Sequence, residues 1–323
     1  MALAITACSS NPVDNPPPTI SPARAAISPR VADAPAGVVH PLPGPGLVGV
    51  FDGATRSLVI LGRDGQGRFV ISVLAGTSPT RPVVLPTAAT AIAGDGGGTA
   101  FLATRGGYFR FDIDRGSVDK VDVVDERDTD FTAITRRADG KLVLGSADGT
   151  VYTMSSDDTV GARLHIFARV DALAAQDNTV VVLDRGQTSV TEVDSSGTRA
   201  EQALRAGDGA TTIAADPRGR VLVANTRGDE LLVFGTDPLI LRQRYPVPDA
   251  PYGVAGSSRL AWVSQTAANV VVGYDLSTGI PVEKVRYRTV QQPDSLSFDD
   301  ASGTLYVVSG SGAGVQVIAG ASR

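Results

Sequence analysis

Carboxylate and amide side chains stand beside three short apolar runs in this sequence. Asp184 and Asn225 each follow directly on four apolar residues, and Asp171 immediately precedes another such run. Hard divalent cations prefer oxygen ligands of this kind, and a bound cation can activate water for hydrolysis. Asp and Asn at strand ends also hydrogen-bond to the backbone of turns. The pattern therefore leaves two interpretations open, a cation site and turn stabilisation.

The same polar positions recur in a repeated unit, which widens the candidate site. One set of residues lies two positions before the centre of each first apolar run, and a second set ends each following run. The first set is Thr90, Thr132, Asp171, Thr211, Tyr252 and Asp294. The second set is Thr104, Ser146, Asp184, Asn225, Gln265 and Ser309. We predict a hydrogen-bonding collar for a small polar ligand, a peptide or a cation, with Asp171, Asp184, Asn225, Gln265, Tyr252 and Asp294 as the binding residues.

Basic and imidazole side chains near this collar are few. Arg105, Arg185 and Arg227 each lie one or two residues past the end of a run, where they could steer an anionic partner or stand as ordinary exposed turn residues. The two histidines, His40 and His165, have no Ser, Cys or carboxylate at a suggestive spacing. We therefore predict no catalytic triad, no histidine metal site and no cofactor.

The collar positions belong to seven copies of one unit. The first strands are expected to centre on Val50, Ile92, Ile134, Leu173, Ile213, Val254 and Leu296, with spacings of 39 to 42 residues. Each unit reads as a strand, an Asp/Gly turn, a second strand and further strands, and a period near forty is typical of a β-propeller blade. The sequence predicts an all-β, seven-bladed propeller over residues 37–323, with its loops gathered around a central channel.

The last repeat provides only three strands, ending at Ile318. A three-stranded last blade would leave an unpaired edge. The segment 37–42 precedes the first repeat, and its prolines at positions 41 and 43 suit an outermost strand. We predict that this segment pairs outside Val315–Ile318 and joins the first blade to the last.

The first 36 residues are different in kind. Cys8, the only cysteine, follows the run Leu3-Ala-Ile-Thr-Ala and precedes Ser9-Ser10, which resembles a bacterial lipobox. This resemblance implies cleavage before Cys8 and a lipid anchor there; the alternative is an incidental thiol. Only seven residues precede Cys8 and none is basic, so we expect the true start of the signal peptide to lie upstream.

Residues 9–36 are rich in proline and read as a linker. Such a composition is expected to form neither helix nor sheet, to remain disordered and to act as an extended spacer. The predicted organisation is a signal and lipobox segment over 1–8, a linker over 9–36, and the propeller over 37–323.

The overall charge limits the choice of partners. The formal net charge is −5, and the basic residues are scattered along the chain. A phosphate-backbone footprint needs clustered basic residues, so we expect no nucleic-acid partner. We expect a monomer attached to a membrane through the lipid at Cys8.

The repeats resemble the NHL and YVTN propellers, as the stretches Pro248-Asp-Ala-Pro-Tyr-Gly-Val-Ala and Gln292-Pro-Asp-Ser-Leu-Ser-Phe-Asp show. The chain as a whole resembles mycobacterial lipoproteins of the LppL type, most clearly at 99–109, 139–149 and 309–318. That resemblance implies a lipid-anchored protein on the extracytoplasmic side of the cell membrane, and it carries over no catalytic residue.

We therefore expect a non-enzymatic binding or scaffolding propeller in the cell envelope, which serves an envelope protein or a small polar ligand. The alternative is a divalent-cation-dependent lactonase or hydrolase of the propeller class.

Overall fold

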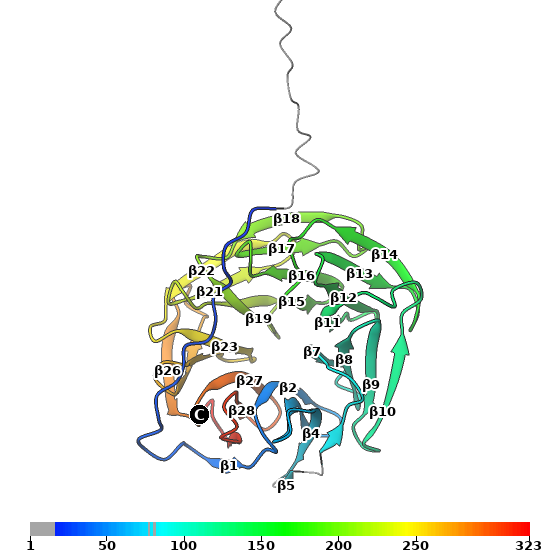
Figure 1. Ribbon diagram of the computed structural model, residues 1–323. Helices are drawn as coiled ribbons and strands as arrows, with labels where there is room; N and C mark the ends of the chain where they lie inside the picture. Colours follow the sequence, from blue (N-terminus) through cyan, green and yellow to red (C-terminus); the bar gives the residue numbers. More distant parts are fainter. Residues whose placement is uncertain (1–16, 77, 80–81) are drawn as a thin grey trace, which may run out of the picture.

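Short apolar runs between Asp- and Gly-containing turns form strands throughout the chain. The computed structural model describes residues 17–76, 78–79 and 82–323, and this part contains 29 strands and no α-helix. The strands form seven antiparallel sheets, which stand around a central axis like the blades of a propeller (Figure 1). The predicted fold class and blade number are confirmed.

The inner and second strands of the blades follow the predicted repeat. The inner strands are β2 (Gly46–Asp52), β7 (Ala91–Gly94), β11 (Phe131–Arg136), β15 (Ala172–Gln176), β19 (Ala210–Asp216), β23 (Pro251–Gly256) and β27 (Pro293–Asp299). The second strands are β3 (Ser57–Arg63), β8 (Thr99–Thr104), β12 (Leu142–Ser146), β16 (Thr179–Asp184), β20 (Arg220–Asn225), β24 (Ala261–Gln265) and β28 (Thr304–Ser309). All seven predicted strand centres lie within the inner strands.

The third and outer strands complete the blades. The third strands are β4 (Phe69–Ala75), β9 (Gly107–Asp112), β13 (Thr150–Met154), β17 (Ser189–Val193), β21 (Glu230–Gly235), β25 (Val270–Asp275) and β29 (Val315–Ile318). The outer strands are β5 (Ser78–Pro79) with β6 (Val83–Val84), β10 (Ser117–Asp122), β14 (Val160–His165), β18 (Ala200–Arg205), β22 (Ile240–Pro246), β26 (Val282–Arg288) and β1 (Val38–His40).

The core lies between neighbouring blades. Val59 and Leu61 of β3 pack against the second blade, whereas Leu58 and Ile60 of the same strand pack against the last blade. Successive side chains of a strand point to opposite faces, so a strand between two blades must be apolar on both. This is why the second strands are continuous apolar runs rather than alternating ones.

The ring closes through its two ends. β1 pairs antiparallel with β29, with Val38 opposite Val317 and His40 opposite Val315, and so becomes the outer strand of the last blade. The predicted closure by the N-terminal segment is confirmed. An otherwise exposed strand edge is covered in this way.

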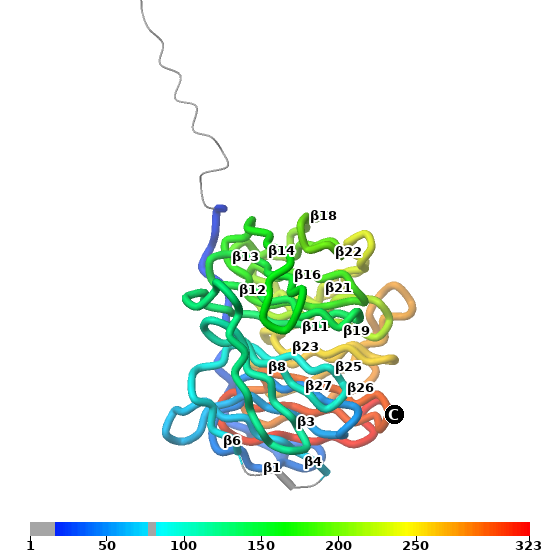
Figure 2. Tube along the Cα trace, turned by 90° about the vertical axis from the view of Figure 1, so that its right-hand side faces the viewer, coloured from blue at the N-terminus to red at the C-terminus, as the bar shows by residue number. Residues whose placement is uncertain are grey.

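Residues 17–36 contain no helix or strand, but they do not form the free spacer that the sequence predicts. They run along one face of the ring from the fourth blade to the last (Figures 1 and 2). Ala23 and Ser28 are buried there, with 6% and 4% of their surface exposed. We call residues 17–36 the strap. Backbone groups that the proline-rich sequence leaves unpaired find hydrogen-bond partners in the loops of the ring.

Candidate functional site

The strap lies on the face of the ring where the sequence predicts the ligand site. On this face the loops between second and third strands meet the loops that lead into the inner strands. We call this the channel face. The Nη2 atom of Arg185 donates a hydrogen bond to the carbonyl oxygen of Ala23, and Nη2 of Arg227 donates to that of Ser21 at 2.7 Å. Two of the arginines predicted to steer an anionic partner therefore hold the strap backbone.

Arg105, the third of these arginines, lies on the second blade and forms ion pairs with other loop residues. Its Nη2 atom is 3.2 Å from Oδ1 of Asp128, and its Nη1 atom is 3.3 Å from Oδ1 of Asp130. Its side chain remains well exposed. The charge that could attract an anion is thus partly balanced by two carboxylates.

The residues that end the second strands are all buried, with at most 1% of their surface exposed: Thr104, Ser146, Asp184, Asn225, Gln265 and Ser309. They stabilise loops. Asp184 Oδ2 accepts hydrogen bonds from the amides of Ala168 and Arg169 at 2.9 and 3.1 Å. Asp184 thus stabilises a loop, whereas Thr104 of the same set lines a hollow of about 620 Å³ together with Thr90, Thr132 and Arg105.

Asn225 and Gln265 show the same use of polar side chains. Asn225 accepts a hydrogen bond from the amide of Gly209 at 2.9 Å and donates to Oε2 of Glu230 at 2.8 Å. Gln265 donates to the carbonyl of Pro248 at 2.9 Å and accepts from Arg286 at 2.8 Å. Neither side chain is exposed to solvent, so both act within the fold.

Several hydroxyls of the inner strands join one blade to the next. Thr90 donates to the carbonyl of Phe131 at 2.8 Å, and Thr132 donates to that of Val170 at 2.5 Å. Thr212, the neighbour of the predicted Thr211, donates to the carbonyl of Tyr252. A hydroxyl that hydrogen-bonds to the next blade has the same position in the repeat as one that faces a ligand. The repeat alone therefore could not distinguish a structural hydroxyl from a ligand-binding one.

Asp171 precedes the inner strand of the fourth blade, and Asp184 ends the second strand of the same blade. Oδ2 of Asp171 accepts a hydrogen bond from the Arg185 amide at 2.8 Å, and Oδ1 accepts from Nε of Arg169 at 3.1 Å. Burial raises the pKa of Asp171, and the hydrogen bond and charge of Arg185 oppose this rise. Within the described ranges, no group of three or more His, Cys, Asp and Glu side chains is arranged to hold a metal ion.

The inner strands enclose a hollow of about 310 Å³ within the channel, which we call the channel pocket. Its apolar walls include Leu47, Val48, Ile213, Val254 and Leu296. Its polar lining is formed by Thr211, Thr212, Tyr252, Asp294 and Ser295. Tyr252 and Asp294, two of the predicted binding residues, thus come together here from the sixth and seventh blades.

Asp294 is the acidic side chain that lines the channel pocket. Oδ1 accepts a hydrogen bond from Nε2 of Gln292 at 2.8 Å. Oδ2 lies against the Gly310 backbone and receives no hydrogen bond from a described residue. Burial raises the pKa of Asp294 to about 6, against the effect of the Gln292 hydrogen bond. Close to neutral pH, the pocket therefore contains a carboxylate that can accept a further hydrogen bond.

Tyr252 adds a hydroxyl to this pocket. Burial raises the pKa of Tyr252; the positive charge of Arg185 lowers it and the negative charge of Asp294 raises it. The hydroxyl is thus protonated near neutral pH. Together, Tyr252 and Asp294 offer a donor and an acceptor against an apolar wall.

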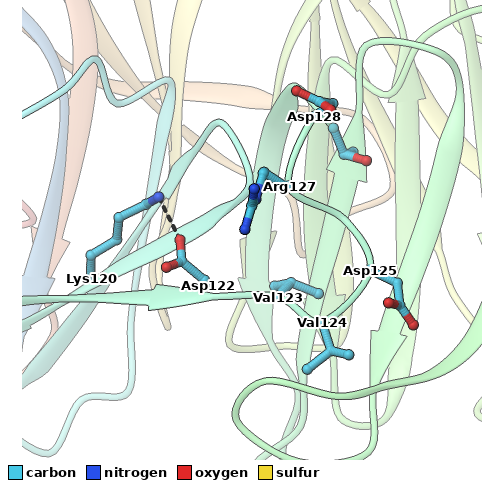
Figure 3. Close-up of a pocket in the computed structure, with 8 residues that line it drawn as sticks. Lys120, Asp122, Val123, Val124, Asp125, Arg127 and Asp128 are labelled. Carbon is cyan, nitrogen blue, oxygen red and sulfur yellow. Dashed lines mark ion pairs between the residues drawn. The ribbon is translucent and has the colours of Figure 1, made fainter.

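A second hollow, of about 700 Å³, lies beside the loop that follows β10 (Figure 3). Lys120 Nζ is 2.5 Å from Oδ1 of Asp122, and the Arg127 side chain also lines the hollow. Asp125 and Asp128 lie along the same loop, so charges of both signs surround the hollow. Its charges come from the end of the outer strand β10 and from the irregular loop that follows it, so the repeat pattern gave no signal for this hollow.

Comparisons with known proteins support the fold. No protein-family model and no curated protein sequence match the chain. Among solved structures, a chain of hydrazine synthase from Kuenenia stuttgartiensis has a TM-score of 0.70 at 14% identity, over 87% of this chain and 97% of that one. A streptogramin B lyase has a TM-score of 0.69 at 10% identity, over 88% of this chain and 96% of that one.

A third similar structure is a catalytically inactive variant of virginiamycin B lyase from Staphylococcus aureus with quinupristin, in which a histidine is replaced by alanine. Its TM-score is 0.70 at 11% identity, over 88% of this chain and 97% of that one. At these identities the likeness shows a shared seven-bladed propeller fold and no shared activity.

Proposed function

We propose that this protein is a lipid-anchored, extracytoplasmic binding protein whose channel pocket takes a small ligand with an apolar body and a protonated amine. The observation that carries this proposal is the pairing of Asp294 and Tyr252 inside a hollow of about 310 Å³ with aliphatic walls. Ligand sites are mostly apolar, with a few polar groups that fix orientation. A carboxylate with an unpartnered oxygen favours a cationic donor.

The proposed role is binding without catalysis. A seven-bladed propeller of similar size is described with quinupristin, which supports the idea that this architecture can host a small molecule. That lyase is inactive when a histidine is replaced. Here His40 and His165 lie in the outermost strands β1 and β14, away from the inner strands that line the channel pocket. This placement favours a binding role.

The proposed location rests on the first residues of the chain. Cys8 lies outside the described residues, and the lipobox pattern around it supports lipid attachment at that position. Resemblance to the mycobacterial lipoproteins of the LppL type supports the same location. In this proposal the membrane is reached through the lipid, and the propeller presents its channel face to the envelope.

The ligand class can be tested with three probes of equal length: hexylammonium, hexanol and hexanoate. We expect saturation-transfer NMR to show binding of hexylammonium in preference to the other two. Asp294→Asn should weaken that binding about tenfold, because a charged hydrogen bond is lost. Asp119→Asn is the matched control, because Asp119 is exposed on the outer strand β10. Equal binding of all three probes, or none, would contradict the proposal.

A further inference from the structure

The strap is held by two residues whose backbones adopt the left-handed conformation. Asn269 and Gln292 have φ angles of 52° and 57°, a region that residues other than glycine seldom occupy. Nδ2 of Asn269 donates to the carbonyl of Pro29 at 2.7 Å, and its Oδ1 accepts from the Gln292 amide at 3.2 Å. Thr188 and Asp229, which also directly precede third strands, have the same left-handed φ as Asn269, so the turn sets this conformation. The Asn269 side chain is what joins the strap to the ring.

Gln292 connects the strap directly to the channel pocket. Its Oε1 accepts a hydrogen bond from the amide of Ser28 at 3.0 Å. Its Nε2 donates to the carbonyl of Ala26 at 2.9 Å and to Oδ1 of Asp294 at 2.8 Å. One side-chain amide thus satisfies two strap groups and the carboxylate of the pocket. If the strap leaves, Gln292 loses two of these three bonds.

The surface beneath the strap is shaped to receive small residues. A Cβ atom placed on Gly209 would lie 2.8 Å from Cβ of Ala23, too close for two carbon atoms. The Ser28 hydroxyl donates to the carbonyl of Thr266 at 2.5 Å. The strap is therefore fitted at two separate points, one beside the fifth blade and one between the sixth and seventh.

We propose that docking of the strap sets the ligand affinity of the channel pocket, with Gln292 as the positioning residue that couples the two. A docked strap fixes the Gln292 side chain, and Gln292 then orients the Asp294 carboxylate for a cationic ligand. Release of the strap frees Gln292 and lowers the affinity. This inference rests on the proposed function, since it assumes that the pocket binds an amine.

Two Ser-Pro pairs in the strap provide a matched test. Ser28→Pro removes the amide that bonds to Gln292 and the hydroxyl that bonds to Thr266. Ser21→Pro makes the same change in the same sequence context, where the carbonyl that accepts from Arg227 remains. We expect Ser28→Pro to weaken hexylammonium binding about fivefold, as for the loss of one hydrogen bond, and Ser21→Pro to leave it unchanged. Trypsin cleavage after Arg24 and Arg30 should become faster in Ser28→Pro alone, which reports release of the strap.

A second readout does not depend on any ligand. The carbon-13 shift of the Asp294 carboxyl reports its titration, and its midpoint should move to higher pH in both Ser28→Pro and Gln292→Ala, because the Gln292 hydrogen bond lowers the pKa of this group. If the wild type binds hexylammonium, but Ser28→Pro and Gln292→Ala change neither the affinity nor the titration midpoint of Asp294, the coupling is overturned and the proposed function stands. Absence of binding in the wild type would overturn the proposed function instead, and an unmoved titration would still overturn the coupling.

Discussion

At the scale of single residues, Asp294 departs clearly from the ordinary behaviour of a carboxyl group. Its pKa is raised from the ordinary value of 3.8 to about 6, chiefly by burial. Gln292 donates the one hydrogen bond that the carboxylate receives from a described side chain. Burial raises the pKa of Tyr252, so its phenol stays protonated between pH 4 and 8. Asp294 changes charge within that range.

This shift predicts how stability depends on pH. Between pH 4 and 6 the folded state holds a proton on Asp294 that the unfolded state has released, so the stability contributed by Asp294 is lost as pH rises through about 6. Asp294→Asn keeps an acceptor for Gln292 and carries no charge. We expect the variant to be about 1–2 kcal/mol more stable than the wild type at pH 7.5 and equal to it at pH 4. Urea unfolding at both pH values measures this, and a difference that does not change with pH would contradict it.

At the scale of elements, the strands were predictable because each apolar run must be buried on both faces. Leu58 to Leu61 reads as one continuous apolar run, and alternate members pack against different blades. β1 was predictable by counting strands, because the last repeat lacks one. Apolar runs and turn residues are both visible in short stretches of sequence, and they are sufficient to predict the strands and blades.

The candidate site was predictable only in part. Tyr252 and Asp294 line the channel pocket because the repeat places them at equivalent depths. Asp184 belongs to the other repeated set, at the end of a second strand, and its carboxylate accepts hydrogen bonds from amides of the loop that leads into its own blade. Contacts of the strap, such as that between Ser28 and Gln292, join residues 264 positions apart. No local pattern encodes a pairing at that separation, so the strap was predicted as a spacer.

Trp262 of β24 tests how strongly adjacent blades hold together. It is fully buried and stacks on Phe298 of the next blade, with ring centroids 5.4 Å apart. We expect Trp262→Ala to cost about 3–5 kcal/mol of stability, because a large cavity opens between the blades. Trp262→Phe should cost far less, because the ring contact is kept and the indole N–H, which has no hydrogen-bond partner in the described part of the chain, is removed. Urea unfolding followed by circular dichroism measures both, and a loss below about 1 kcal/mol for Trp262→Ala would show that this contact is not important.

At the scale of the whole molecule, the strap changes how the ring can be tethered. Both ends of the propeller are joined in the last blade, yet the strap carries the chain across the channel face to the fourth blade (Figures 1 and 2). Eight residues, 9–16, then separate Cys8 from the described chain. Eight residues span at most about 30 Å. A lipid at Cys8 would hold the ring nearer the membrane than a spacer extending to residue 36 would allow.

The lipid anchor itself predicts a clear change in location. When the protein is expressed in its own host from its natural gene, we expect it in the membrane fraction, labelled by a palmitate analogue. Cys8→Ser removes the only thiol of the chain, so both the label and the membrane association should be lost. A single acyl chain already gives measurable membrane binding and two make it stable, so the expected loss is nearly complete. Ser9→Ala is the control and should keep both. A Cys8→Ser protein that stays with the membranes would show that something other than this thiol attaches it.

The short reach of residues 9–16 also limits the distance between the anchored wild-type ring and the membrane. A fluorophore attached to the channel face should therefore transfer energy efficiently to acceptor lipids.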